Sequence, residues 1–138
     1  MSAKPPLADT PIHVKFKLSA LWATIMFCYI YADIIGFFRP GQLQSMLAGQ
    51  YPLGAVSQRG LLGMAIVLSI PGVMVFLSLV LKPRINRWAN IVLGTVYTVL
   101  ILLTMLHAWH FYVFYGIIDV LLSAFIVWYA VKWPQVRH

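Results

Sequence analysis

The hydrophobic residues of this chain fall into four long runs, separated by short segments that contain prolines, glycines and charged residues. The runs cover about residues 18–38, 60–81, 88–108 and 112–133, close to the roughly 20 residues that a helix needs to cross a bilayer. Their apolar character is nearly continuous around the helix, as lipid contact requires. The pattern predicts an all-α, four-helix membrane bundle that forms a single domain over residues 1–138.

The segments between the runs predict where the helices end. Arg39-Pro40-Gly41 follows the first run and Lys82-Pro83 the second, and proline interrupts a helix because it lacks the amide hydrogen. Residues 107–112 contain no glycine, proline or charge. We nevertheless expect a tight turn there, because one helix over 88–133 is too long for a single crossing.

The connection over residues 39–59 is the only long one, and it predicts a short amphipathic helix at about 42–49. Leu43, Met46 and Leu47 follow helical spacing beside polar residues. Such a helix could lie among the lipid headgroups or cap the bundle like a lid. The first dozen residues contain three prolines and predict a flexible tail.

Composition and charge support this class of protein and indicate its orientation. The chain is 62% hydrophobic and 9% charged, far from the roughly 25% charged residues of soluble domains. Its net charge of +7 comes from residues at helix ends, which argues against nucleic-acid binding and for contact with lipid headgroups. Arg39 and Arg59 lie on one side of the predicted bundle, and the other side holds Lys4, Lys15, Lys17, Lys82, Arg84, Arg87, Lys132 and Arg137. The positive-inside rule then predicts an inner (cytoplasmic) membrane protein with both termini in the cytoplasm.

Two of the three acidic residues, Asp33 and Asp119, lie inside the apolar runs. A charge near the bilayer centre costs at least about 2.5 to 3.5 kcal/mol, so it normally faces a protein interior, a partner or water. Asp33 precedes the outer end of its run by five residues, about 7 to 8 Å, and Asp119 follows the start of its run by seven. We therefore expect both acids at one depth, in a polar pocket in the outer half, with the inner half packed with Leu, Ile and Val.

Helical spacing and topology bring further polar groups toward the two acids. Tyr29 shares a face with Asp33, whereas Tyr112, Tyr115 and Ser123 share one with Asp119. The candidate residues for binding an ion or small molecule are therefore Asp33, Asp119, Arg59, Tyr29, Tyr115 and Ser123. A divalent zinc, manganese or iron ion could bind to His107, His110, Asp33 and Asp119, although the Glu-x-x-His motif of di-iron bundles is absent.

Other functions stay open at this stage. The acids could form a proton relay or an ion-coupled transport site, which in so short a chain would need a homo-oligomer. They could instead pair with Arg59 or Arg39 and fix the register of the helices. The chain could also be an accessory subunit of a larger membrane complex, or a metal-dependent membrane enzyme. No nucleophile elbow, phosphate loop or zinc-protease motif supports an enzyme.

Proline and glycine inside the runs predict where helices bend and where they approach closely. Pro71 has no amide to donate to the carbonyl of Val67, so a kink is expected in the second run. Gly60, Gly63 and Gly94 would permit close contacts between helices.

Several short motifs resemble those of an uncharacterised bacterial family of small four-helix integral membrane proteins. The similarity extends over about residues 18–133 and implies a four-span prokaryotic protein of one domain, with no activity or catalytic residue to transfer. The motifs are Tyr31-Ala32-Asp33-Ile34-Ile35-Gly36, Ile70-Pro71-Gly72-Val73-Met74, Asn86-Arg87-Trp88-Ala89-Asn90 and Trp128-Tyr129-Ala130-Val131-Lys132-Trp133.

Overall fold

Four long helices make up most of the structure, a computed structural model that describes residues 10–51 and 54–134. They are α1 (Val14–Gly36), α3 (Gln58–Val80), α4 (Pro83–Met105) and α5 (His110–Val131). Each has 22 or 23 residues and is long and apolar enough to cross a membrane. The prediction of an all-helical protein with four candidate membrane spans is therefore confirmed.

The connection between α1 and α3 contains the remaining elements. A short helix, α2 (Gln42–Leu47), is followed by two antiparallel strands of two residues each, β1 (Gln50–Tyr51) and β2 (Gly54–Ala55). Gly41 and Gly49 flank α2 with φ angles of 77° and 69°, a left-handed conformation that favours glycine. No residue of α2 is buried. Its position relative to a membrane stays a prediction.

The helices differ from the predicted runs mainly at their first turns. α1 begins at Val14 rather than near residue 18. Its first turn is stabilised by Lys15, whose Nζ donates to the carbonyls of Leu79 and Leu81 at 3.0 and 2.8 Å. α4 begins at Pro83 rather than near residue 88, since proline at the first helical position loses no hydrogen bond. All four helices also end one to three residues earlier than predicted.

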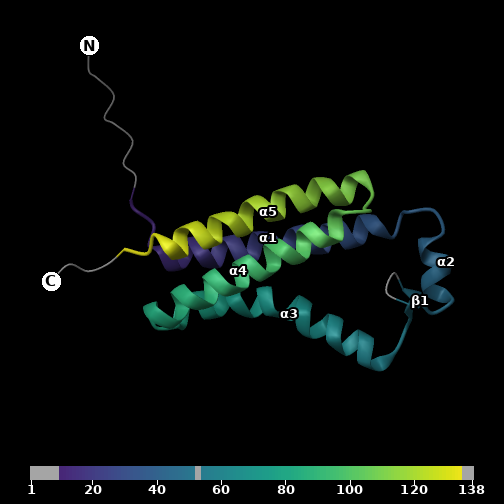
Figure 1. Ribbon diagram of the computed structural model, residues 1–138, viewed down its shortest axis with the longest axis horizontal. Helices are drawn as coiled ribbons and strands as arrows, with labels where there is room; N and C mark the ends of the chain where they lie inside the picture. The colour runs from purple at the N-terminus through teal and green to yellow at the C-terminus, as the bar shows by residue number, and fades with distance from the viewer. Residues whose placement is uncertain (1–9, 52–53, 135–138) are drawn as a thin grey trace, which may run out of the picture.

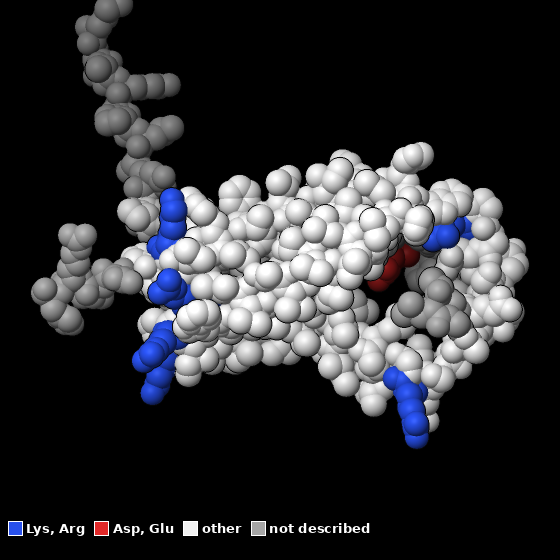
Figure 2. Space-filling view, viewed as in Figure 1, with Lys and Arg blue, Asp and Glu red and all other residues white. Residues whose placement is uncertain are grey.

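The helices form an open arc rather than a closed ring. α1 packs against α3 and α5, and α4 packs against α5, whereas α3 and α4 contact each other little. Figure 1 shows that the first half of α3 leans away from the other helices. The start of α1, the α3–α4 connection and the end of α5 lie together at one end, which we call the basic end because Figure 2 shows most Lys and Arg side chains there.

The half of the bundle next to the basic end contains a buried polar network. Trp22 Nε1 donates to Asn90 Oδ1 at 2.7 Å, and Asn90 Nδ2 donates to Asn86 Oδ1 at 2.7 Å. Asn86 Nδ2 in turn donates to the carbonyl of Ser78, one of the last four in α3, which have no donor within their own helix. This half contains the expected Leu, Ile and Val side chains, but the polar network was not predicted; it supplies a donor to a carbonyl at the α3–α4 connection.

Glycine permits a close approach at one of the three predicted positions. A Cβ on Gly94 would lie 2.9 Å from Val127 Cγ2 and 3.3 Å from Ile126 Cγ2, so α4 and α5 are in close contact there. A Cβ on Gly63 would have no neighbour within 4 Å, and one on Gly60 would meet only the hydroxyl of the Ser57 cap. The expectation for these two is wrong because the first half of α3 leans away from the bundle.

Candidate functional site

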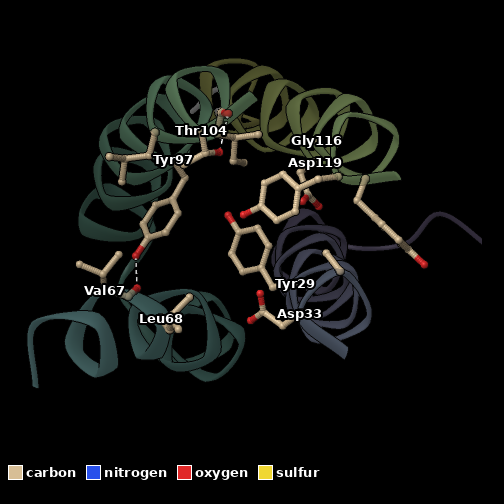
Figure 3. A pocket seen from close by; sticks show the side chains of 13 residues that line it. Tyr29, Asp33, Val67, Leu68, Tyr97, Thr104, Gly116 and Asp119 are labelled. Carbon is tan, nitrogen blue, oxygen red and sulfur yellow. Dashed lines mark hydrogen bonds between the residues drawn. The ribbon is translucent and has the colours of Figure 1, made fainter. Parts of the chain in front are cut away.

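Pro71 leaves one carbonyl of α3 without a donor in its own helix, and Tyr97 of α4 supplies that donor. Pro71 is buried within α3 and has no amide hydrogen for the Val67 carbonyl, as expected from the sequence. The Tyr97 hydroxyl of α4 donates a hydrogen bond to this carbonyl (Figure 3). The unpaired backbone acceptor created by the proline is therefore satisfied from the neighbouring helix.

A cavity of about 140 Å³ lies next to this link and is lined by residues of all four long helices. One water molecule needs about 10 to 15 Å³ of cavity volume measured in this way, so the cavity has room for several waters or a small organic molecule. The polar lining consists of Tyr29, Asp33, Tyr97, Thr104, Tyr112, Tyr115 and Asp119. The remaining walls are formed by Ala32, Val67, Leu68, Leu100, Ile101 and Gly116.

Asp119 lies deep in this cavity. It is nine residues from the start of α5, about 13 to 14 Å along the helix, and thus close to the middle of the span. Its side chain is 3% exposed, and its Oδ1 has no hydrogen-bond partner among the described residues. The Cys28 thiol of α1 lies against the same carboxyl group. Burial without a partner makes this carboxyl oxygen energetically unfavourable as it stands.

Asp33 occupies a different position, near the opposite end of the bundle from the basic end. It lies three residues before the end of α1, about 4 to 5 Å along the helix, and its side chain is exposed. Figure 2 shows acidic atoms at the wall of a hollow in this region. The two acids line one cavity, but the expected equal depth is wrong: Asp33 lies three residues from the end of its helix and Asp119 nine residues from the start of its own, a difference of about 9 Å along the helices.

The tyrosines supply most of the other polar groups. Tyr29 and Tyr115, both predicted from spacing, line the cavity together with Tyr112. Figure 3 shows Tyr29 projecting from α1 into the space between the helices, one turn from Asp33. Tyr97 was missed, although the released carbonyl at Val67 was a signal that a donor was required nearby. As far as the structure describes the chain, no Lys, Arg or His side chain lines the cavity.

Two predicted binding residues lie outside the cavity. Ser123 is buried between α4 and α5, where its Oγ donates to the Asp119 carbonyl at 2.7 Å and accepts from Thr98 Oγ1 at 2.9 Å. Arg59 is exposed in the first turn of α3 and does not line the cavity. The Arg39 guanidinium lies 5.1 Å from the centre of the Trp109 ring. Within the described ranges, neither arginine pairs with Oδ1 of Asp119.

The structure does not assemble the four residues considered for a metal site. His107 follows the end of α4, and His110 is the first residue of α5, so the two imidazoles are not on one helix face. Within residues 10–51 and 54–134, no three His, Cys, Asp or Glu side chains are grouped in a way that could hold a metal ion. The histidines therefore do not join Asp33 and Asp119 in the described structure.

Comparison with known proteins identifies a family but no activity. The sequence model of a family of unknown function (DUF6326) matches residues 11–137. Neither the curated proteins nor the solved structures include a significant match to the chain.

Proposed function

The chain belongs to this family of unknown function, and on the geometry of its cavity we propose that it is a multi-pass membrane protein that binds an ion or small molecule between its four helices. Asp119 would hold the ligand deep in the cavity, and Asp33 would attract it at the mouth. Tyr29 and Tyr115 would contribute hydroxyl groups or aromatic contacts to the bound species.

One observation carries this proposal: the buried Oδ1 of Asp119 has no partner among the described residues, although it lies in the wall of a cavity. An intramembrane carboxyl group costs energy and is normally paired or placed in an aqueous path. Retaining one of its oxygens without a partner is understandable where binding requires it, because functional sites commonly lower the stability of the free protein. A bound ligand would supply the missing partner.

The orientation that we propose puts Asp33 near the outer surface. Among the described residues, Lys15, Lys17, Lys82, Arg84, Arg87 and Lys132 belong to the basic end, and only Arg39 and Arg59 belong to the opposite end. An excess of this kind favours a cytoplasmic location for the basic end, and hence for both termini, in the inner membrane. The cavity would then extend from the middle of the membrane into its outer half.

A binding screen with the full-length protein in non-ionic detergent tests the proposed function. Thermal unfolding of the wild type, Asp33→Asn and Asp119→Asn would be followed by tryptophan fluorescence. The probes are n-butylammonium chloride, sodium butyrate, 1-butanol, sodium chloride and zinc chloride at matched ionic strength. At least one probe should raise the wild-type Tm, because a ligand that binds only the folded state stabilises it.

The variants decide whether such binding uses the cavity. Asp119→Asn should abolish the Tm rise and Asp33→Asn should reduce it, whereas Arg59→Gln, an exposed charge change outside the cavity, should retain it. The proposed function fails if no probe stabilises the wild type, or if both aspartate variants respond as strongly as the wild type does.

A further inference from the structure

We propose that the ligand of this cavity is a small protonated organic amine with an apolar substituent. This inference rests on the proposed function and specifies the chemical class that the site would accept. It follows from three properties of the cavity: the sign of its charge, the hydrogen-bonding character of its polar groups, and the apolar part of its wall.

The charged groups of the lining are of one sign. Asp33 and Asp119 are both acidic, and no basic side chain from the described part of the chain lines the cavity. An anionic ligand would face like charges in a poorly solvated space, which raises its free energy. A cation would compensate the carboxylates and would provide the partner that Asp119 Oδ1 lacks.

Two of the five hydroxyl groups that line the cavity, those of Tyr97 and Thr104, favour a ligand that donates hydrogen bonds. The Tyr97 hydroxyl donates its proton to the Val67 carbonyl, and Thr104 Oγ1 donates to the Ile101 carbonyl at 2.8 Å. With their protons used in this way, both oxygens can act only as acceptors toward a ligand. An ammonium group has donors but no acceptor, so it complements the carboxylates and these oxygens together.

The rest of the wall argues for an organic ligand rather than a bare ion. Apolar side chains of three helices form part of the wall: Ala32 of α1, Val67 and Leu68 of α3, and Leu100 and Ile101 of α4. A bare ion at Asp119 would leave these apolar side chains in contact with water, whereas an alkyl or aryl group would bury them. Tyrosine rings in the lining add aromatic faces that attract organic cations. The described residues also lack a cluster suited to a metal ion.

The different depths of the two acids assign them different parts in binding. Asp119 is buried near the middle of its helix, where it would contact the bound ammonium group. Asp33 is exposed and nearer the helix end, where its charge would attract a cation approaching the mouth. Charges at a rim act mainly on the association rate, and buried pairs act mainly on dissociation. Asp33→Asn should therefore slow association, and Asp119→Asn should speed dissociation.

Titration calorimetry on the full-length protein in non-ionic detergent tests the ligand class. The probes are n-butylammonium, its neutral analogue 1-butanol and its anionic analogue butyrate, with sodium and zinc chloride as the inorganic ions. We expect n-butylammonium to bind at least tenfold more tightly than any other probe. Preferential binding of zinc, sodium, butanol or butyrate that depends on Asp119 overturns the amine assignment but leaves the proposed function standing. Absence of binding by all five probes overturns both.

Variants of the lining separate a specific site from partition of the amine into the micelle. Asp119→Asn should weaken n-butylammonium binding at least tenfold, and Tyr29→Phe should weaken it more than Tyr31→Phe, an exposed tyrosine on the same helix outside the lining. If Asp119→Asn does not fold, Leu68→Trp provides a second variant, because it fills the apolar part of the cavity and leaves both acids in place. Unchanged n-butylammonium affinity in Leu68→Trp would overturn the proposal.

Discussion

The hydrogen bond from Tyr97 to Val67 links α3 to α4 beside the cavity, and Tyr97→Phe removes it while changing little else. The Tyr97 side chain is 4% exposed, and its ring packs edge-on against Trp22 at a centroid distance of 5.9 Å. Phenylalanine retains that packing. The variant therefore tests the hydroxyl group alone.

The expected loss is about 1 to 2 kcal/mol in the free energy of unfolding. Hydrogen bonds between membrane helices contribute about 0.6 kcal/mol on average and up to about 1.7 kcal/mol. Here the lost donor leaves the Val67 carbonyl unpaired, because residue 71 is a proline and has no amide hydrogen. An unsatisfied acceptor of this kind adds to the loss.

A double-mutant cycle with Pro71→Ala isolates this contribution. Alanine restores an amide that can donate to the Val67 carbonyl within the helix, so the carbonyl no longer depends on Tyr97. In the Pro71→Ala background, Tyr97→Phe should then cost less than about 0.5 kcal/mol. The coupling energy between the two sites should be about 1 kcal/mol.

Unfolding by SDS in mixed micelles, followed by tryptophan fluorescence, measures all four proteins of the cycle. Tyr31→Phe serves as the control, because Tyr31 is exposed on α1 and its change should shift stability by less than about 0.5 kcal/mol. Equal costs of Tyr97→Phe with and without Pro71 would refute the reasoning, since the hydroxyl would then not be compensating for the missing amide.

Three further predictions concern packing, the polar network and the buried acid. Gly94→Ala should lower the free energy of unfolding by about 1 to 3 kcal/mol, because the added Cβ would press on α5. Gly63→Ala, with open space around it, should not destabilise the protein, and SDS unfolding of both variants tests the difference. Asn90→Ala should cost about 1 to 3 kcal/mol and shift the fluorescence of Trp22, whose Nε1 loses its acceptor; an unchanged spectrum would contradict the network. Asp119→Asn should raise the unfolding free energy by about 1 to 3 kcal/mol while abolishing ligand binding, and a loss of stability instead would mean that the carboxylate is paired.

The sequence predicted the four helices well and their first turns less well. The apolar runs are long enough to form helices that could cross a membrane. Lys15 precedes the first apolar run, yet it belongs to α1, where its long side chain reaches the carbonyls at the end of α3. The contact that stabilises this first turn comes from residues more than sixty positions away in the chain.

In the site too, the spacing of residues along the chain predicted some features, and the packing of the helices determined others. Topology predicted that Asp33 and Asp119 come from helices that meet, and the structure has both in the lining of one cavity. Helical spacing also put Ser123 beside Asp119, but its hydroxyl bonds to the Asp119 backbone carbonyl and to Thr98, where α4 approaches closely, and it does not line the cavity. Which of several polar residues on a helix faces a cavity depends on how the neighbouring helix packs, and that is not contained in the spacing.

Hydropathy and run length act on each segment separately, so the class of the protein, four helices apolar enough to cross a membrane, can be read from the sequence. The sequence also determined that two acids, a proline and several tyrosines lie in those helices. Which polar groups have partners depends instead on how the helices pack. Trp22 and Asn90, 68 residues apart, satisfy each other, as do Tyr97 and Val67, 30 residues apart, whereas Oδ1 of Asp119 has no partner among the described residues. Hydrogen bonds between helices depend on their rotation and separation, which are set by packing across the whole bundle.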